Sequence, residues 1–495
     1  MCMAQSLLPQ SSDCGSILFA EERTMREPNR ATAADPWAVY EPTKETPWNL
    51  RRVVHLHRRA GFGATWQEIQ RDLKGGPKAS IDRLLAGKSR SQGVSETFEK
   101  NAAALADAAV GSGDAVGSEG PERLKGWWVY RMLFGSDPLS ERLTLMWHSH
   151  FATSNLKIND LAAMRRQNEL FRKYARAPFA DLLNAAVRDP ALLLFLDAPD
   201  NRKGHPNENL ARELMELFTL GIGHYAEQDV KEAARALTGW RVKAGAFREY
   251  APDHDDREKT ILGRRGRWNG ADLVKLLLEH SATADRLAFR ICDLFMGEKA
   301  IDAAALKALA EGLRRNHLDV GWAVATVLRS RAFFAPANLG TQVRGPIEYL
   351  VGTARALEQF DHPPSTLALA DWAARLGQDL CYPPNVGGWP GGRAWLTTAA
   401  VIGRANYAAA LVGGELSAGA GRRPLDAVAL ARRHRRGGGL EDLVMFYAEL
   451  LLGIDPGPAW RERLIRALGA RPVLDAETAR RAVVLVLASP QAQLA

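Results

Sequence analysis

Two glutamates one helical turn apart are the first candidates for chemistry in this sequence. Glu213 and Glu216 lie in the segment 207–220, where apolar residues recur with the period of an α-helix and the acidic residues fall on the other side. At this spacing both carboxylates can reach one point, as metal ligands or as a coupled acid/base pair. Arg212 stands beside them as a further catalytic candidate, although its spacing from Glu208 also fits an ion pair on a solvated surface.

Short polar residues stand at the start of the same helix. Asn207 and Asn209 are expected where unpaired backbone N–H groups favour an anion, so we take both as candidates for substrate binding. The helix follows the very apolar run 191–196, so its polar side could line a cleft instead of facing solvent.

Two histidines could supply metal ligands or acid/base groups. His148 and His150 flank Ser149 at the end of an apolar helical segment. Positions i and i+2 of a helix point about 200° apart, so both rings can face one ion only if the helix frays there. The alternative is that one ring forms a hydrogen bond in the core and the other caps carbonyl groups at the helix end.

A His-Asp pair in an irregular segment completes the predicted metal site. His254 and Asp255 could supply a ligand and a carboxylate that orients it, or could only stabilise a turn. Ligands of these types suit Zn, Mn or Fe. The predicted metal-binding set is His148, His150, Glu213, Glu216, His254 and Asp255.

A loop rich in proline and glycine carries the remaining substrate-binding candidates. Asn385 and Trp389 lie in the irregular segment 378–396, and Trp395 follows them. Such a loop can form the aromatic wall of a binding cleft, or it can fill the space between two helical halves of the molecule.

The elements that position these residues are predicted to be helices almost throughout. From Pro47 onward, apolar residues follow a 3.6-residue period, which fails only in the segment 241–260, a loop or small hairpin, and in the loop 378–396. We predict an all-α fold, a large multi-helical globular domain with little or no β-structure.

Three segments are expected along the chain. Residues 1–46 are expected to be a disordered N-terminal segment, and residues 47–415 a helical core with a polar insertion at about 87–122. Residues 416–495 are expected to form a C-terminal helical subdomain packed on this core.

The charge of the chain is basic but dispersed. The sequence has 65 Lys and Arg against 57 Asp and Glu among 495 residues, and the densest basic runs, 263–267 and 432–436, are short. No nucleic-acid platform is predicted, while an acidic substrate stays compatible with the charge. No apolar run approaches the roughly 18 residues of a membrane span. The start lacks a secretory pattern, so a cytoplasmic location is expected, with export left open if the true start lies elsewhere.

Several motifs together resemble the bacterial DUF1800 family, a domain of unknown function. The matching segments are Trp147-His-Ser-His-Phe-Ala-Thr-Ser154, Asn207–Trp240, His254-Asp255 with Lys259-Thr-Ile-Leu-Gly263, and Tyr382-Pro-Pro-Asn-Val-Gly-Gly-Trp-Pro-Gly391. Ser149 stands where the family has Asn, and Ala226 where it has Thr. The resemblance implies a helical fold and no established reaction. It also implies a partner related to sulfatases and encoded nearby, and export of many members.

Three functions are compatible with these residues. The first is a metal-dependent hydrolase or oxidoreductase with a His/Glu site in a helical cleft. The second is a non-catalytic helical scaffold or accessory protein of a partner enzyme. The third is a metal-free hydrolase that uses a glutamate as acid or base on an acidic or sugar-like substrate. No nucleophile elbow, phosphate-binding loop or dinucleotide fingerprint is present.

Overall fold

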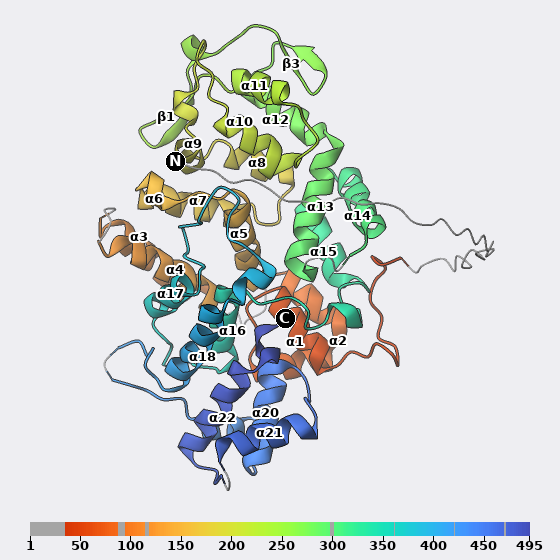
Figure 1. Ribbon diagram of the computed structural model, residues 1–495, viewed down its shortest axis with the longest axis vertical. Coiled ribbons are helices and arrows are strands. Elements are labelled where there is room, and N and C mark those ends of the chain that lie inside the picture. The colour runs from red at the N-terminus through yellow and green to blue at the C-terminus, as the bar shows by residue number, and fades with distance from the viewer. Residues whose placement is uncertain are drawn as a thin grey trace, which may run out of the picture. The chain divides into compact units, whose positions relative to one another are not determined.

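Helices dominate the structure, a computed structural model that describes residues 35–87, 95–113, 118–297, 301–360, 362–419, 421–469 and 472–495. Within these ranges the chain forms 22 α-helices and four short β-strands (Figure 1). The predicted all-α class is therefore confirmed. None of the described helices is both long enough and apolar enough to span a bilayer.

The described part of the chain begins before the predicted boundary at residue 47. Residues 36–495 form one compact unit. The indole of Trp37 donates a hydrogen bond to the carbonyl of Ala305 at 2.8 Å, and the Tyr40 ring packs 4.6 Å from that of Phe334. Residues 36–46 are thus docked on distant helices, in contrast to the disorder expected for them. The rest of the predicted disordered segment, residues 1–34, lies outside the described residues.

The first five helices include the predicted polar insertion. They are α1 (Leu50–Arg59), α2 (Trp66–Leu85), α3 (Ser95–Val110), α4 (Gly120–Phe134) and α5 (Pro138–His150). Gly76, at φ 78°, and Pro77 bend α2. In the insertion, α3 buries Ala102, Ala106 and Ala109, so the small residues at helical spacing dock this helix against the rest of the fold.

The central segment leads from α5 into two short hairpins. Its helices are α6 (Asn155–Ile158), α7 (Leu161–Lys173), α8 (Phe179–Ala186), α9 (Pro190–Phe195), α10 (Asn209–Glu213), the π-helix Leu214–Thr219 and α11 (Glu227–Ala236). The antiparallel hairpins pair β1 (Trp240–Lys243) with β2 (Ala246–Glu249), and β3 (Lys259–Ile261) with β4 (Arg264–Gly266). The first hairpin matches one of the two readings of segment 241–260.

Eleven further helices complete the described chain. They are α12 (Gly270–Glu279), α13 (Ser281–Met296), α14 (Ala303–Arg315), α15 (Val320–Arg329), α16 (Pro346–Ala356), α17 (Thr366–Arg375), α18 (Thr398–Val412), α19 (Ala427–Arg433), α20 (Leu440–Leu452), α21 (Pro458–Leu468) and α22 (Ala476–Ala488). The segment 378–396 is a loop, as predicted, with a short 3-10 turn at Gly392–Trp395.

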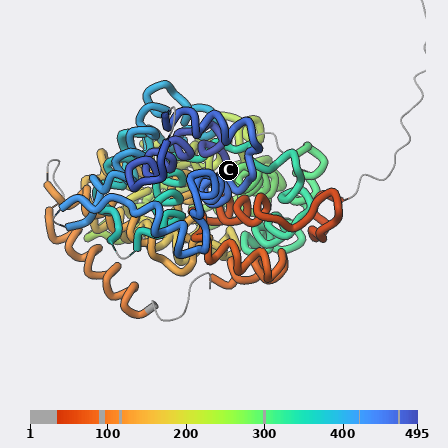
Figure 2. Tube along the Cα trace, turned by 90° about the horizontal axis from the view of Figure 1, so that it is seen from below, coloured from red at the N-terminus to blue at the C-terminus, as the bar shows by residue number. Residues whose placement is uncertain are grey.

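The buried apolar side chains form two clusters that meet at α1 and α5. One cluster contains residues of α4 and of α16 to α22, and the other contains residues of α8 to α15. Val53 and Leu145 belong to the first cluster, whereas Leu56 and Met146, on the same two helices, belong to the second. In Figures 1 and 2, α1 and α2 lie beside α13 to α15. Residues of α19 to α22 share this first cluster with residues of α16 to α18.

Candidate functional site

A cleft of about 410 Å³ lies between α5, α13, residues 342–348 and the loop 378–395. This volume is within the range of small-molecule sites, roughly 300–1,000 Å³. Trp389 and Trp395, both predicted to bind substrate, lie in its wall. The polar and charged residues of the lining are Arg142, Ser149, Arg290, Asp293, Gln342, Glu348 and Gln378.

An ion pair between two helices forms the floor of the cleft. Asp137 caps α5 by accepting a hydrogen bond from the Ser140 N–H at 3.0 Å, which fixes the start of the helix that carries Arg142. The Arg142 guanidinium, with a side chain 3% exposed, donates to the carboxylate of Glu348 on α16. A second donor of Arg142 binds the carbonyl of Arg59 at 3.3 Å. The pair thus connects α1, α5 and α16 at the junction of the two apolar clusters.

Arginines that bind backbone oxygens lie behind this floor. Arg344 donates to the carbonyl of Glu348 at 2.8 Å, and Arg404 donates to the carbonyl of Arg344 at 2.7 Å. Arg59 donates to the carbonyl of Asn338 at 3.2 Å. Burial lowers the pKa of Arg59 to about 9 and that of Arg344 to about 10. Both remain cations at neutral pH, so the wall of the cleft is electropositive from behind.

Arg290 of α13 lines the cleft, and one of its polar atoms has no partner among the described residues. Its Nε is buried and makes no hydrogen bond within them. Burial lowers the pKa of this arginine, the neighbouring Asp293 raises it, and repulsion from Arg286 lowers it further. The guanidinium is therefore held in a place that favours a nearby anion.

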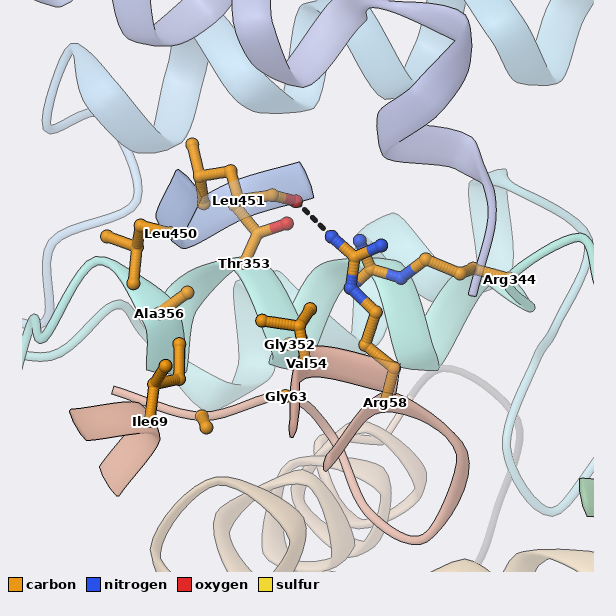
Figure 3. A pocket seen from close by; sticks show the side chains of 11 residues that line it. Val54, Arg58, Gly63, Ile69, Arg344, Gly352, Thr353, Ala356, Leu450 and Leu451 are labelled. Carbon is orange, nitrogen blue, oxygen red and sulfur yellow. Dashed lines mark hydrogen bonds between the residues drawn. The ribbon is translucent and has the colours of Figure 1, made fainter. Parts of the chain in front are cut away.

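A second, much smaller cavity lies beside α1, where Arg58 connects α1 to later parts of the chain. It has a volume of about 20 Å³, the space of a single water, and lies among α1, α16 and α20 (Figure 3). Arg58 reaches across it and donates to the carbonyl of Leu451. Its other donor binds the carbonyl of Leu494 at 2.7 Å. This cavity is too small for a substrate. The hydrogen bonds of Arg58 hold α1 against α20 and the C-terminal residues.

The two histidines of the predicted site have separate surroundings. The helix α5 runs through His150 without fraying, so the two rings do not face one point. His150 Nε2 lies 3.1 Å from the Phe218 carbonyl, and its ring contacts the rings of Phe151 and Phe179. His148 packs between Trp128 and Trp389, with ring centroids 5.3 and 5.5 Å away.

The helix of the predicted glutamates changes its winding at Leu214. There α10 gives way to a π-helix, in which the Leu220 N–H donates to the Met215 carbonyl at 2.8 Å. The carbonyls of Leu217 and Phe218, near the end of this π-helix, accept from Arg286 and His150 instead. Wide π-turns are rare in proteins, and those that occur often lie at functional sites. Sequence reasoning missed this feature, because the apolar spacing is compatible with an α-helix.

Glu213 and Glu216 remain close enough to influence each other. The Tyr225 hydroxyl donates to Glu216 at 2.5 Å, whereas the half-buried Glu213 has no side-chain hydrogen bond to a described residue. Burial raises the pKa of Glu213, and repulsion from Glu216 raises it further. The two neighbouring carboxyl groups therefore have different surroundings.

The other residues of this helix make surface contacts. Arg212 donates to Glu208 at 2.9 Å and to Glu227 at 2.8 Å, which is the surface ion pairing that its spacing allowed. Asn207 accepts from the Asn209 N–H at 2.9 Å. The Asn209 amide in turn donates to Asp197 at 3.0 Å. These contacts order the start of α10.

The irregular segments hold the remaining candidates. His254 Nδ1 lies 3.0 Å from the Thr238 carbonyl. Asp255 accepts from Arg235 and Arg257 at 2.9 Å each, and these bonds hold its pKa far below the usual value. Asn385 accepts from the Gly387 N–H at 2.8 Å and so stabilises a turn of the cleft loop. His254 and Asp255 thus have partners that fit a structural role in their turn.

The predicted ligands are distributed over several places. In the part of the chain that the structure describes, no group of three or more His, Cys, Asp or Glu residues is placed to hold a metal ion. The cleft residues that sequence reasoning missed are Arg142, Arg290 and Glu348. A signal for Arg142 does exist: a charged residue stands between Leu139 and Met146 on an otherwise apolar helical face.

Comparison with known proteins gives the family. The family described as a protein of unknown function (DUF1800) matches residues 55–494. The chain belongs to the DUF1800 family. All residues that line the cleft fall within the DUF1800 match. No match was found among curated proteins or among solved structures.

Proposed function

We propose that this DUF1800 protein binds an acidic small molecule in the cleft between α5, α13 and the loop 378–395. The observation that carries the proposal is Arg290, a cleft-lining arginine whose buried Nε has no partner among the described residues. A carboxylate, phosphate or sulfate group on the ligand would supply the missing acceptor, and Arg–anion hydrogen bonds are among the strongest in proteins.

The charges around the cleft support an anionic ligand. Arg142 and Arg290 line it, and Arg59 and Arg344 lie behind it, whereas Glu348 and Asp293 are the carboxylates of its lining. An anion would offset the mutual repulsion of these arginines. Because the site is concave and partly buried, this attraction is screened less than at an open surface.

The aromatic wall indicates the rest of the ligand. Trp389, Trp395 and Phe289 line the cleft together with Leu145 and Met146. Flat apolar surfaces of this kind bind a ring or a short carbon skeleton, while a few polar groups fix its orientation. The ligand class is therefore an acidic molecule with a compact apolar or ring portion.

Binding is tested with a panel of acidic probes: inorganic phosphate, sulfate, citrate and benzoate. Tryptophan fluorescence and titration calorimetry are measured on the wild type and on Arg290→Gln. We expect at least one probe to bind and the variant to bind it about tenfold or more weakly. Arg375→Gln, at an exposed arginine paired with Asp371, is the matched control and should bind like the wild type. Equal binding by Arg290→Gln would overturn the proposal.

Metal-free acid/base chemistry is a second candidate, supported by the pair of Glu213 and Glu216. Tyr225 donates a hydrogen bond to Glu216, while burial and then repulsion from Glu216 raise the pKa of Glu213. A carboxyl group with a raised pKa beside a second carboxyl group suits a general acid. A screen of nitrophenyl phosphate, sulfate and glucuronide tests it: activity should be lost in Glu213→Gln and retained in Glu208→Gln. Activity that survives in Glu213→Gln would exclude this role.

A further inference from the structure

His148 lies directly behind the cleft and differs from the other buried histidines. Its side chain is 1% exposed, and both of its ring nitrogens are buried without a hydrogen-bond partner among the described residues. By contrast, His55 and His150 each have one nitrogen 3.1 Å from a backbone carbonyl oxygen. A buried polar atom without a partner is destabilising, so a ring with two such atoms calls for an explanation.

The side chain between His148 and the cleft is Trp389. The two ring centroids lie 5.5 Å apart, and Trp389 also lines the cleft. On α5, the neighbours Leu145 and Ser149 line the cleft as well, so its space comes within one helical turn of His148. The indole Nε1 of Trp389 is itself buried and has no partner among the described residues, and the same is true of Trp128 Nε1. Hydrogen-bonding groups without partners therefore stand on both sides of the His148 ring.

The backbone around Trp389 allows the indole to move. Gly387 and Gly388 precede it, and Gly391 and Gly392 follow Pro390. Nothing would lie within 4 Å of a Cβ at Gly391, so the chain after Trp389 has free space. Gly388 instead packs closely against Ser149, which anchors the loop at one end. A tryptophan between an anchored end and a free end is well placed to swing.

We propose that Trp389 is a movable cover, and that with its indole turned aside the His148 ring becomes the inner wall of the cleft and binds a hydrogen-bonding group of the ligand. This inference rests on the proposed function of the cleft. A neutral imidazole offers one donor and one acceptor, and Trp128 Nε1 adds a donor. The inner wall therefore suits hydroxyl or carbonyl oxygens, so the ligand is an acidic molecule that also carries such groups, for example a hydroxy acid.

Burial keeps the imidazole neutral in the covered state. It lowers the pKa of His148 to about 4. At neutral pH the ring therefore keeps one nitrogen as an acceptor, which a protonated ring would lack. Coverage by Trp389 therefore keeps the His148 ring in the neutral form that can bind a hydrogen-bonding group of the ligand.

The opening of the cover is tested on the wild-type chain by the rate at which diethyl pyrocarbonate modifies each histidine, read by peptide mass spectrometry. His150 is the internal control, because it lies two residues further along the same helix and its side chain is likewise buried, at 5% exposure. Opening of Trp389 predicts that His148 reacts about tenfold or more faster than His150. Trp389→Ala should accelerate His148 further and leave His150 unchanged. Equal protection of the two histidines in the wild type would overturn the cover.

Contact with the ligand is tested by repeating the labelling with saturating citrate. Protection of His148 by citrate supports the contact. Binding of citrate to the protein without protection of His148 would mean that only water reaches the ring, and it would overturn this part of the proposal. If instead no acidic probe binds, the proposed function fails while the labelling difference still reports on the cover.

Discussion

His150 Nε2 lies 3.1 Å from the carbonyl oxygen of Phe218, and this contact connects the end of α5 to the π-helix that follows Glu213. The carbonyl can only accept, so Nε2 carries a proton in this contact. Burial and the nearby Arg290 and Arg286 lower the pKa of His150 well below its usual value, which keeps the imidazole neutral at neutral pH. This hydrogen bond joins two of the segments that resemble the DUF1800 family.

Replacement of His150 should destabilise the fold. In His150→Phe the ring volume is largely kept, but the buried Phe218 carbonyl loses its partner. We expect the free energy of unfolding to fall by about 1–3 kcal/mol, measured by urea denaturation. His205→Ala, at an exposed histidine, should stay within about 0.5 kcal/mol of the wild type. A loss in His205→Ala as large as that in His150→Phe would contradict this assignment.

Three buried histidines should make the protein less stable in mild acid. The pKa values of His55 and His150 lie well below the usual value, and that of His148 lies at about 4. These groups are neutral in the folded state and take up protons near pH 6.5 when unfolded. Stability is therefore complete above that pH and falls as the pH decreases below it, by up to about 1.4 kcal/mol per pH unit for each histidine.

The measurement is urea denaturation between pH 7.5 and 5. In His55→Phe the free energy of unfolding should fall less steeply with decreasing pH, because one of the three histidines no longer contributes. A stability profile with the same slope in the variant and the wild type would show that His55 is protonated in the folded state.

Two glycines of the cleft loop should respond differently to a methyl group. At Gly388, φ is +84°, and a Cβ would meet the backbone and side-chain oxygens of Ser149 at 2.4 Å. Gly388→Ala should therefore displace the loop from α5 and weaken binding of an acidic probe about tenfold or more. At Gly391 a Cβ would meet nothing within 4 Å, so Gly391→Ala should bind the probe normally. Fluorescence titration compares the two, and equal affinities would refute the role of the Gly388 contact.

The Arg142–Glu348 pair should contribute far more to the free energy of unfolding than a surface ion pair does. Its side chains are 3% and 16% exposed, so Glu348→Gln leaves a buried guanidinium without its carboxylate. We expect a loss of about 3–5 kcal/mol in unfolding free energy. Glu415→Gln removes an ion pair with Arg422 whose side chains are 53% and 65% exposed, and should cost at most about 1 kcal/mol. Thermal and urea denaturation give both values, and similar losses would argue against a buried pair.

Most of the fold follows from periodicity, and the exceptions have identifiable causes. Most of the helices from α1 onward were predictable because they bury an apolar face of 3.6-residue period. The π-helix was not, because one wider turn over Leu214–Thr219 leaves the apolar spacing almost unchanged. The docking of Trp37 was not predictable either, since its partner Ala305 is 268 residues away and the surrounding sequence is polar.

The site could be predicted only in part, because some of its residues meet partners that are distant in the sequence. The composition of the loop drew attention to Trp389 and Trp395, although the same composition also fits a loop that fills the space between two helical halves. Arg142 and Glu348 form a pair across 206 residues, so the local sequence around Arg142 can show that it is unusual but not that Glu348 is its partner. The polar side of the helix with Glu213 was visible, but the position of that helix relative to α5 was not.

Arg58 sets a limit on when this protein can finish folding during its synthesis. Its guanidinium holds the carbonyl of Leu494, which is 436 residues further along the chain. A ribosome that adds 5–20 residues per second needs roughly 20–90 s to cover that distance. Until then α1 lacks part of its packing partners, and a nascent chain exposes the apolar faces that the last helices will cover. Chaperones that hold incomplete chains are therefore expected to matter for the yield of this protein more than for its final stability.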